Sequence, residues 1–325
     1  MAPSTSTSEF VISQSELTRR VKERAFALGF DCVGVTSADP FDAEAARLSE
    51  WIAAGRHGTM RYMADAADAR RDPRTLFPGA RTIVSVAMNY FTGKRDASDV
   101  GPAGGAVARY AWGRDYHAVL RERLTSLLGA IIEMSPGCEG RVSADAVPLF
   151  EKAIAERAGI GWIGKHTNLI TQSYGSWILL GEILLTIPLD FDEPFAFDYC
   201  GTCVRCIEAC PTQAITAPYE LDATRCISYA TIEHRGKIPD AFRGKMEGWL
   251  FGCDICQEVC PWNRFEQETS TDDFLPRPGL SGLALEAVAH LTKDEYRDRF
   301  AGTALTRARR DGLRRNARFL LEEPT

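Results

Sequence analysis

Apolar residues along the first 190 residues recur in two patterns, and the longer pattern predicts helices. Within 116–133 they return every three or four positions, as on the buried side of an amphipathic helix. These positions are Leu120, Leu124, Leu127, Leu128 and Ile131. A second helix is expected to run to about Leu28, with Ser13 and Glu16 as a capping box at its start. A third is expected at 43–54.

Short apolar runs lie between these helices and predict buried strands. They occupy 31–35, 81–90, 141–146 and 176–187. The last run contains Gly181 and reads as two strands or as one bent strand. Helices that alternate with short strands predict an α/β sandwich.

The pattern changes twice further along the chain, which predicts three regions. Residues 1–190 form the α/β domain, and an acidic, aromatic stretch at 190–198 leads into a cysteine-rich module at 191–265. Residues 266–325 begin with a polar loop and continue as a mostly helical, arginine-rich segment. No solenoid-type repeat is present.

Composition narrows the function classes. The 325 residues are 45% hydrophobic, enough for a full core, and the net charge of −6 gives no general attraction to nucleic acid. The first residues lack the charged and apolar regions of a secretion signal. The longest apolar stretch, 177–189, is interrupted and too short to span a bilayer. We therefore expect a cytoplasmic protein without a membrane segment.

Eight of the ten cysteines lie between Cys200 and Cys260, which favours a metal or redox site over disulfides. The run from Cys200 to Pro211 has the spacing of bacterial ferredoxins, in which the fourth cysteine binds the other cluster. The run from Cys253 to Pro261 is one cysteine short, and Cys226 can supply it.

Exchange of the last cysteine between the runs assigns every one of the eight thiols. The first thiol set is Cys200, Cys203, Cys206 and Cys260. The second thiol set is Cys210, Cys226, Cys253 and Cys256. The sequence therefore predicts two 4Fe–4S clusters close enough for electron transfer. Two zinc knuckles are the less favoured alternative, and Cys32 and Cys138 are expected to be incidental thiols.

Motifs outside the cysteines are similar to those of the tRNA epoxyqueuosine reductases. They follow one another in the same order over nearly the whole chain. The most specific are Asp145-Ala-Val-Pro-Leu-Phe-Glu151, Ala158-Gly-Ile-Gly-Trp-Ile-Gly-Lys165-His166-Thr167, Arg225-Cys-Ile-Ser228-Tyr229, Gly252-Cys-Asp254 and Gly302-Thr-Ala-Leu305.

This resemblance implies a cobalamin held between the two-cluster module and an α/β domain related to B12-processing and reductive-dehalogenase enzymes. It implies removal of the epoxide oxygen of epoxyqueuosine in a tRNA anticodon loop, at the expense of two electrons and two protons. The partners would be the tRNA and an external electron donor such as a flavodoxin or ferredoxin, and the protein would be a monomer.

The resemblance also implies roles for individual residues. Asp145 matches the family's proton donor and would contact the cofactor, although the same residue could simply cap a helix near Pro148. A free aspartate has a pKa of about 3.9, so burial beside the apolar corrin would have to raise the pKa of Asp145 for this role. Cobalamin or substrate contacts are expected from Lys165 and His166, with a solvated surface turn as the alternative. Ser228 and Asp254 are expected to face the cofactor, with local hydrogen bonding near the thiolates as the alternative.

The chain departs from the family at one expected cofactor contact. Relatives commonly have Met-Ala-Arg where this chain has Met63-Ala64-Asp65. Arg70 or Arg71 could replace the missing arginine.

A run of arginines near the end is the candidate RNA-binding surface, because guanidinium groups suit phosphate contacts. The arginine run consists of Arg307, Arg309, Arg310, Arg314, Arg315 and Arg318. A solvated helix face is the alternative. Two other functions stay open at this point, a B12-dependent reductase of a small molecule and a non-catalytic two-cluster electron carrier.

Overall fold

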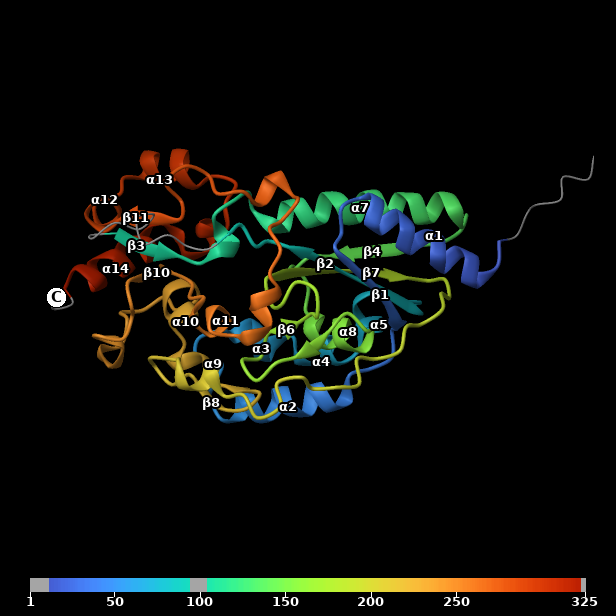
Figure 1. Ribbon diagram of the computed structural model, residues 1–325, viewed down its shortest axis with the longest axis horizontal. Coiled ribbons are helices and arrows are strands. Elements are labelled where there is room, and N and C mark those ends of the chain that lie inside the picture. Colours follow the sequence, from blue (N-terminus) through green and yellow to red (C-terminus); the bar gives the residue numbers. More distant parts are fainter. Residues whose placement is uncertain (1–11, 94–103, 323–325) are drawn as a thin grey trace, which may run out of the picture.

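The computed structural model describes residues 12–93 and 104–322 (Figure 1). Its strands are β1 (Cys32–Ser37), β2 (Thr82–Asn89), β3 (Gly104–Val107), β4 (Gly140–Ser143), β5 (Trp162–Ile163), β6 (Leu169–Ile170), β7 (Ile178–Leu185), β8 (Ile215–Ala217), β9 (Glu220–Leu221), β10 (Trp249–Phe251) and β11 (Gly282–Ala284). The α-helices are α1 (Gln14–Ala27), α2 (Asp42–Ala53), α3 (Arg61–Asp65), α4 (Ala67–Arg71), α5 (Pro73–Leu76), α7 (Tyr116–Met134), α8 (Glu151–Arg157), α9 (Arg205–Glu208), α10 (Ile227–Ile232), α11 (Ile255–Glu258), α12 (Leu285–Ala289), α13 (Lys293–Phe300) and α14 (Arg309–Leu321).

Short 3-10 helices connect several of these elements. They are η1 (Arg109–Ala111), η2 (Ala223–Arg225), η3 (Asp240–Phe242), η4 (Pro261–Phe265), η5 (Asp272–Phe274) and η6 (Ala304–Ala308).

An antiparallel sheet in the order β1-β2-β7-β4 forms the centre of the first region. Helices α1 and α7 lie above it in Figure 1, and α8, α5 and α2 lie below. One core therefore forms between the sheet and α1 and α7, and a smaller one forms on the α8 side. This arrangement confirms the predicted α/β sandwich. The run 176–187 is one strand, β7, rather than two.

The predicted helices follow the sequence signals closely. Ser13 accepts a hydrogen bond from the backbone of Glu16 at the start of α1. On α7 the predicted apolar face is buried except for Leu128, which is partly buried. Asp115 caps α7 by accepting from the backbone N–H of His117. The helix expected near Pro148 begins later, as α8.

A second sheet joins distant parts of the chain. Strand β3 pairs in parallel with β10 and antiparallel with β11. The core around this sheet draws residues from 106–112, 227–251 and 280–320. Part of the first predicted region therefore packs with the last one, and the boundaries at 190 and 265 stay predictions.

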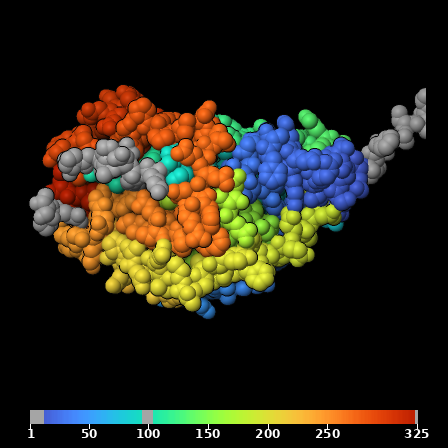
Figure 2. Space-filling view, viewed as in Figure 1, coloured from blue at the N-terminus to red at the C-terminus, as the bar shows by residue number. Residues whose placement is uncertain are grey.

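The cysteine-rich module lies against both cores. Its short helices α9 and α11 contact each other, and each begins within a cysteine run. The yellow and orange residues form a continuous band across one face in Figure 2. Within the described residues, no helix combines the length and the apolar character that crossing a membrane requires.

Candidate functional site

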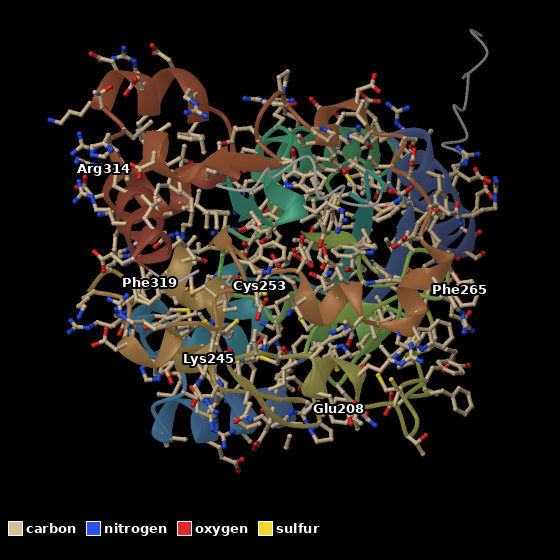
Figure 3. All side chains as sticks on the ribbon, turned by 60° about the vertical axis from the view of Figure 1, so that its left-hand side comes forward. Glu208, Lys245, Cys253, Phe265, Arg314 and Phe319 are labelled. Atoms are coloured by element: carbon tan, nitrogen blue, oxygen red, sulfur yellow. The ribbon has the colours of Figure 1, made fainter. Side chains whose placement is uncertain are left out.

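A cavity of about 860 Å³ lies where the α/β sandwich, the module and the C-terminal helices meet. Its walls include Asp145, His166, Ser228, Asp254 and Arg307, which are far apart in the sequence. The second thiol set lines the same cavity. Figure 3 labels one of its members, Cys253, near the middle of the molecule.

The eight thiols lie in the two groups that cysteine exchange predicts. The thiol of Cys206 has those of Cys200, Cys203 and Cys260 as neighbours, and burial together with these thiols raises the pKa of Cys206 to about 11. Cys260 thus lies with the first run although it belongs to the second.

The second thiol set is grouped in the same way. Burial raises the pKa of Cys256, and the neighbouring thiols Cys226, Cys206 and Cys210 add to the shift, so the second set lies next to Cys206 of the first. Burial also raises the pKa of Cys253, which faces Cys256 and Cys226. Thiols with such raised pKa values need a positively charged centre to become thiolates.

The spacing of the thiols does not suit a single ion. In the part of the chain that the structure describes, no three Cys, His, Asp or Glu side chains are close enough to hold one metal ion. Zinc requires sulfur ligands at about 2.3 Å from the ion. This finding gives no support to the zinc-knuckle alternative.

The two thiol sets face different spaces. Cys260, from the first set, lies in a surface depression of about 710 Å³ between α9 and α11. The charged residues of that depression are Arg205, Glu208, Glu258, Arg264 and Glu266. Cys260 of the first set therefore borders the surface depression, whereas the second set borders the cavity.

Asp145 lies in the turn between β4 and α8, and several contacts fix it there. Its φ of 51° is in the left-handed region, an uncommon conformation for a residue other than glycine. The Tyr116 hydroxyl donates to Oδ2 of Asp145 at 2.5 Å, and the backbone N–H of Asp145 donates to Glu151 at 2.8 Å. The Nε2 atom of His117 lies 3.5 Å from the same Oδ2. The carboxylate itself faces the cavity, with 59% of the side chain exposed.

The contacts of Asp145 within the protein act against the rise in pKa that the role of proton donor calls for. Enclosure by the cavity walls acts to raise it, but His117 and Tyr116 stabilise the carboxylate and the net pKa is lowered. Asp145 is therefore an ionised carboxylate at neutral pH. It does not cap α8, whose N-cap is Phe150.

A row of polar groups lies deeper in the sheet, in register across three strands. Glu182 of β7 pairs with Ser85 of β2 and Ser143 of β4. All three side chains are buried, and Glu182 also interacts with Glu151. Burial and the Glu151 charge raise the pKa of Glu182 well above its usual value. The pKa of Glu151 is raised to about 7 by burial and by Asp145.

His166 and Lys165, expected to act together, point to different places. His166 lines the cavity and is only 4% exposed, and its Nε2 atom has no hydrogen-bond partner among the described residues. Burial and the Lys152 charge lower the pKa of His166 to about 4, so the imidazole is neutral. Lys165 instead donates to the carbonyls of Gly201 and Cys203, at 2.5 and 3.1 Å. Lys165 therefore contacts the first cysteine loop, in place of the predicted contact with the cofactor.

Ser228 and Asp254 both line the cavity, beside ligands of the second thiol set. Asp254 is 2% exposed, and its Oδ2 atom accepts a hydrogen bond from the backbone of Arg109 at 2.8 Å. The Arg109 guanidinium lies 3.8 Å from the same oxygen and packs over Trp177. Asp254 thus anchors η1 as well as facing the cavity.

Of the two arginines that could replace the family's contact, only Arg70 lines the cavity. It donates to the Leu149 carbonyl, and its buried Nε atom has no partner in the part of the chain that the structure describes. Arg71 pairs with Asp42 outside the cavity, and Asp65 is exposed away from it.

The arginine run does not form one surface. Arg307 lines the cavity, pairs with Glu233 at 2.7 Å, and has Arg309 and Arg235 close by. Arg310 pairs with Asp311.

The remaining arginines serve the fold. Arg314 and Arg318 both donate to the carbonyl of Ala289 at the end of α12. In Figure 3 Arg314 lies at the outer edge of the C-terminal helices. Arg315 donates to the carbonyls of Ala230, His234 and Gly236 at the end of α10. These three side chains hold helix ends, so their assignment to RNA is not supported.

Sequence reasoning missed Tyr116 and His117 as site residues. They follow the Asp115 cap at the start of α7, and an Asp-Tyr-His triplet at a helix start was the available signal. Glu151 was part of a recognised motif, but only the fold shows that it holds the backbone of Asp145.

Comparison with known proteins agrees with this geometry. The model of the 4Fe-4S double cluster binding domain matches residues 199–263, and that of the epoxyqueuosine reductase QueG family matches residues 70–146. The epoxyqueuosine reductase of Leadbetterella byssophila is 42% identical, over 94% of this chain and 99% of its own. That of Synechocystis sp. is 46% identical, over 86% and 96%.

Solved structures give the same relationship. A crystal structure of epoxyqueuosine reductase with a tRNA-Tyr epoxyqueuosine-modified tRNA stem loop has a TM-score of 0.87 and 32% identity, over 95% of this chain and 82% of that one. The epoxyqueuosine reductase of Streptococcus thermophilus has a TM-score of 0.82 and 30% identity, over 93% and 80%. This chain belongs to the epoxyqueuosine reductase family.

Proposed function

We propose that this protein reduces epoxyqueuosine to queuosine in the anticodon loop of a tRNA in the cytoplasm, with a cobalamin and two 4Fe–4S clusters as cofactors. One observation carries the proposal. The Asp145 carboxylate and the second thiol set lie on the walls of the same cavity, so a proton-handling group and an electron-delivering group face one substrate space.

Each thiol set would hold one cluster, the first near the surface depression and the second beside the cavity. An external one-electron donor such as a flavodoxin or ferredoxin would bind at the depression. The cavity suits a large cofactor, because buried polar atoms of His166 and Arg70 have no partner among the described residues. Bound cobalamin supplies the reduced cobalt centre at which a carbon–oxygen bond can be broken.

The residues of this chain manage the protons. Opening the epoxide leaves a negative charge on oxygen, and that oxygen needs a proton at neutral pH. Asp145 lines the cavity with its side chain 59% exposed, held by Tyr116 and by its backbone bond to Glu151. Two electrons and two protons are consumed and water leaves.

Arginines at one wall of the cavity would hold the tRNA. Arg307, Arg309 and the neighbouring Arg235 place positive charge beside Tyr62, whose ring lies 5.7 Å from the Arg307 guanidinium. Both Arg307 and Tyr62 line the cavity. Such a surface suits phosphate contacts and stacking of an extruded base. One solved relative was captured with a tRNA stem loop.

The test is conversion of the modified base. Protein loaded with both clusters and cobalamin is mixed with a low-potential reductant and epoxyqueuosine-containing tRNA, and the digested nucleosides are separated. We expect queuosine to form with the wild type and the Asp145→Asn variant to form at least a hundredfold less, the loss typical of a proton donor. Retention of epoxyqueuosine by the loaded wild type would contradict the proposal.

A further inference from the structure

An ionised Asp145 needs a source for the proton that it passes on. Its pKa is lowered, so the carboxyl carries no proton of its own at neutral pH. Two side chains offer a proton to it, the Tyr116 hydroxyl at 2.5 Å and the His117 ring at 3.5 Å. Enclosure raises the pKa of Tyr116 and Asp145 raises it further, so the phenol keeps its proton. His117 remains as the donor.

The His117 ring lies between two carboxylates. Its Nδ1 atom is 2.7 Å from Oδ1 of Asp115, and its Nε2 atom is 3.5 Å from Oδ2 of Asp145. A neutral imidazole has a hydrogen on only one nitrogen, whereas an imidazolium can donate to both acceptors. The Tyr116 ring stacks on it, with ring centroids 4.0 Å apart, which holds the ring in this orientation.

The surrounding charges favour the imidazolium. Burial acts to lower the pKa of His117, but Asp115 and Asp145 outweigh it and raise the pKa to about 9. The other charged or titratable neighbours of this group are Arg121 on the same helix, and Glu151, Lys152, Arg307, Arg70, Glu233, Tyr62 and Tyr110 from other elements. The cations and the carboxylates among them partly offset each other, and the two nearest groups, Asp115 and Asp145, are both carboxylates.

In the series Asp145, His117 and Asp115, the end away from Asp145 is partly exposed. The His117 side chain is 33% exposed and that of Asp115 is 28% exposed. Asp115 is the N-cap of α7, and His117 lies in the first turn of the helix. Asp115 does not line the cavity, so solvent at its exposed face can resupply a proton lost from the ring.

We propose that His117, oriented by Asp115, passes a solvent proton to Asp145 in each turnover. The proton moves from Nε2 of His117 to Oδ2 of Asp145, and from Asp145 to the oxygen released from the epoxide. The neutral ring then takes a proton from water and the cycle closes. No electron moves in these steps, since the two electrons come from the external donor through the clusters. The inference rests on the proposed function, and His117 acts through Asp145 as a positioning and relay group.

The first test needs no tRNA and so stands apart from the proposed function. Nitrogen-15 NMR of the full, cluster-loaded chain follows the titration of the His117 ring. We expect a pKa of about 9 in the wild type, and a fall toward the ordinary value near 6.5 in Asp145→Asn and in Asp115→Asn. A wild-type His117 pKa at or below the ordinary value would overturn the proposal.

The second test is the pH profile of turnover with chemical rescue. The His117→Gln variant should lose about tenfold or more in rate at neutral pH, and added imidazole should restore part of it. The Tyr116→Phe variant, which keeps the relay, is the matched control and should not respond to imidazole. A His117→Gln enzyme with the wild-type rate and pH profile would overturn the proposal. If the wild type itself fails to convert the tRNA while the titration behaves as expected, the proposed function fails and the coupling of the three groups stands.

Discussion

The backbone N–H of Asp145 donates a hydrogen bond, 2.8 Å long, to Oε1 of Glu151 six residues later. This bond holds a turn in which Asp145 has a φ of 51°. For an aspartate that conformation costs on the order of 1 kcal/mol, so the turn needs outside support. In the epoxyqueuosine reductase of Bacillus subtilis, the loop carrying the catalytic aspartate has been captured swung out of the active site.

The Glu151→Ala variant should therefore release the Asp145 turn. A lost hydrogen bond to a carboxylate of about 1.5–3 kcal/mol corresponds to a fall of roughly tenfold to a hundredfold in kcat. Glu151→Gln keeps an oxygen acceptor at the same place and is the matched control. Steady-state kinetics with the modified tRNA measures both variants, and equal losses in the two would argue against the positioning role.

Glu182 should make the stability of the fold depend on pH. Its pKa is raised by burial, so the carboxyl is neutral in the folded state at a pH where the unfolded chain ionises it. The stability that the neutral form contributes is complete below about pH 4.5 and is lost as pH rises through the folded-state pKa. Glu151, with a pKa of about 7, acts in the same direction.

The Glu182→Gln variant removes this dependence while keeping the shape of the side chain. We expect its Tm to exceed that of the wild type at about pH 8 and to approach it at about pH 5. Thermal unfolding followed by circular dichroism at both values measures the difference. A Tm gap that is the same at both pH values would mean that Glu182 does not titrate on unfolding.

Cys226 should be required for one cluster only. The Cys226→Ser variant should retain about four iron atoms per chain instead of about eight, because the first thiol set stays intact. The matched control is Cys32→Ser, since Cys32 lies in β1 and should leave the iron content unchanged. Iron and sulfide analysis after reconstitution gives the result. Full iron content in the Cys226→Ser variant would contradict the assignment.

Lys165 should matter for the first cluster and not for cobalamin binding. Its ammonium holds the loop carbonyls of Gly201 and Cys203. The Lys165→Met variant should lose iron from the first thiol set, with an unchanged Kd for added cobalamin in a visible-absorbance titration. A weaker affinity for cobalamin at full iron content would instead mean that Lys165 contacts the cofactor, as the sequence predicted.

The arginine run should divide into binding and structural residues. Arg309→Ala should weaken tRNA binding and lower the slope of log K against log salt by about one. Arg310→Ala is the matched control, because that side chain pairs with Asp311. Filter binding at several salt concentrations measures both. Equal effects of the two changes would mean that the wall beside Arg307 is not the RNA surface.

Sequence patterns predicted the sandwich because its elements are long and periodic. Helix α7 shows five apolar positions on one side, and β2 and β7 are eight-residue strands made mostly of apolar residues. The β3-β10-β11 sheet was not predictable, since its three short strands come from distant parts of the chain. Pairing at such range depends on tertiary packing rather than on local signals.

The site was predictable in its residue types and less so in its contacts. The spacing of the eight cysteines along the chain was enough to predict two ligand sets, because the geometry of a cluster limits the lengths of the loops between its ligands. The lowered pKa of Asp145 depends on Tyr116 and His117 from another element, which no local pattern reveals. Arg315 looked like an RNA contact until the fold placed the end of α10 beside it.

The most direct measurement is a single-turnover experiment on epoxyqueuosine-containing tRNA. The protein loaded with both clusters and cobalamin is reduced, freed of excess reductant and mixed with the tRNA. The mass of the product nucleoside is then measured by mass spectrometry. The account predicts a nucleoside lighter by one oxygen with the wild type, and unchanged epoxyqueuosine with Asp145→Asn. Loss of the oxygen at the same rate in both proteins, or in neither, would contradict it.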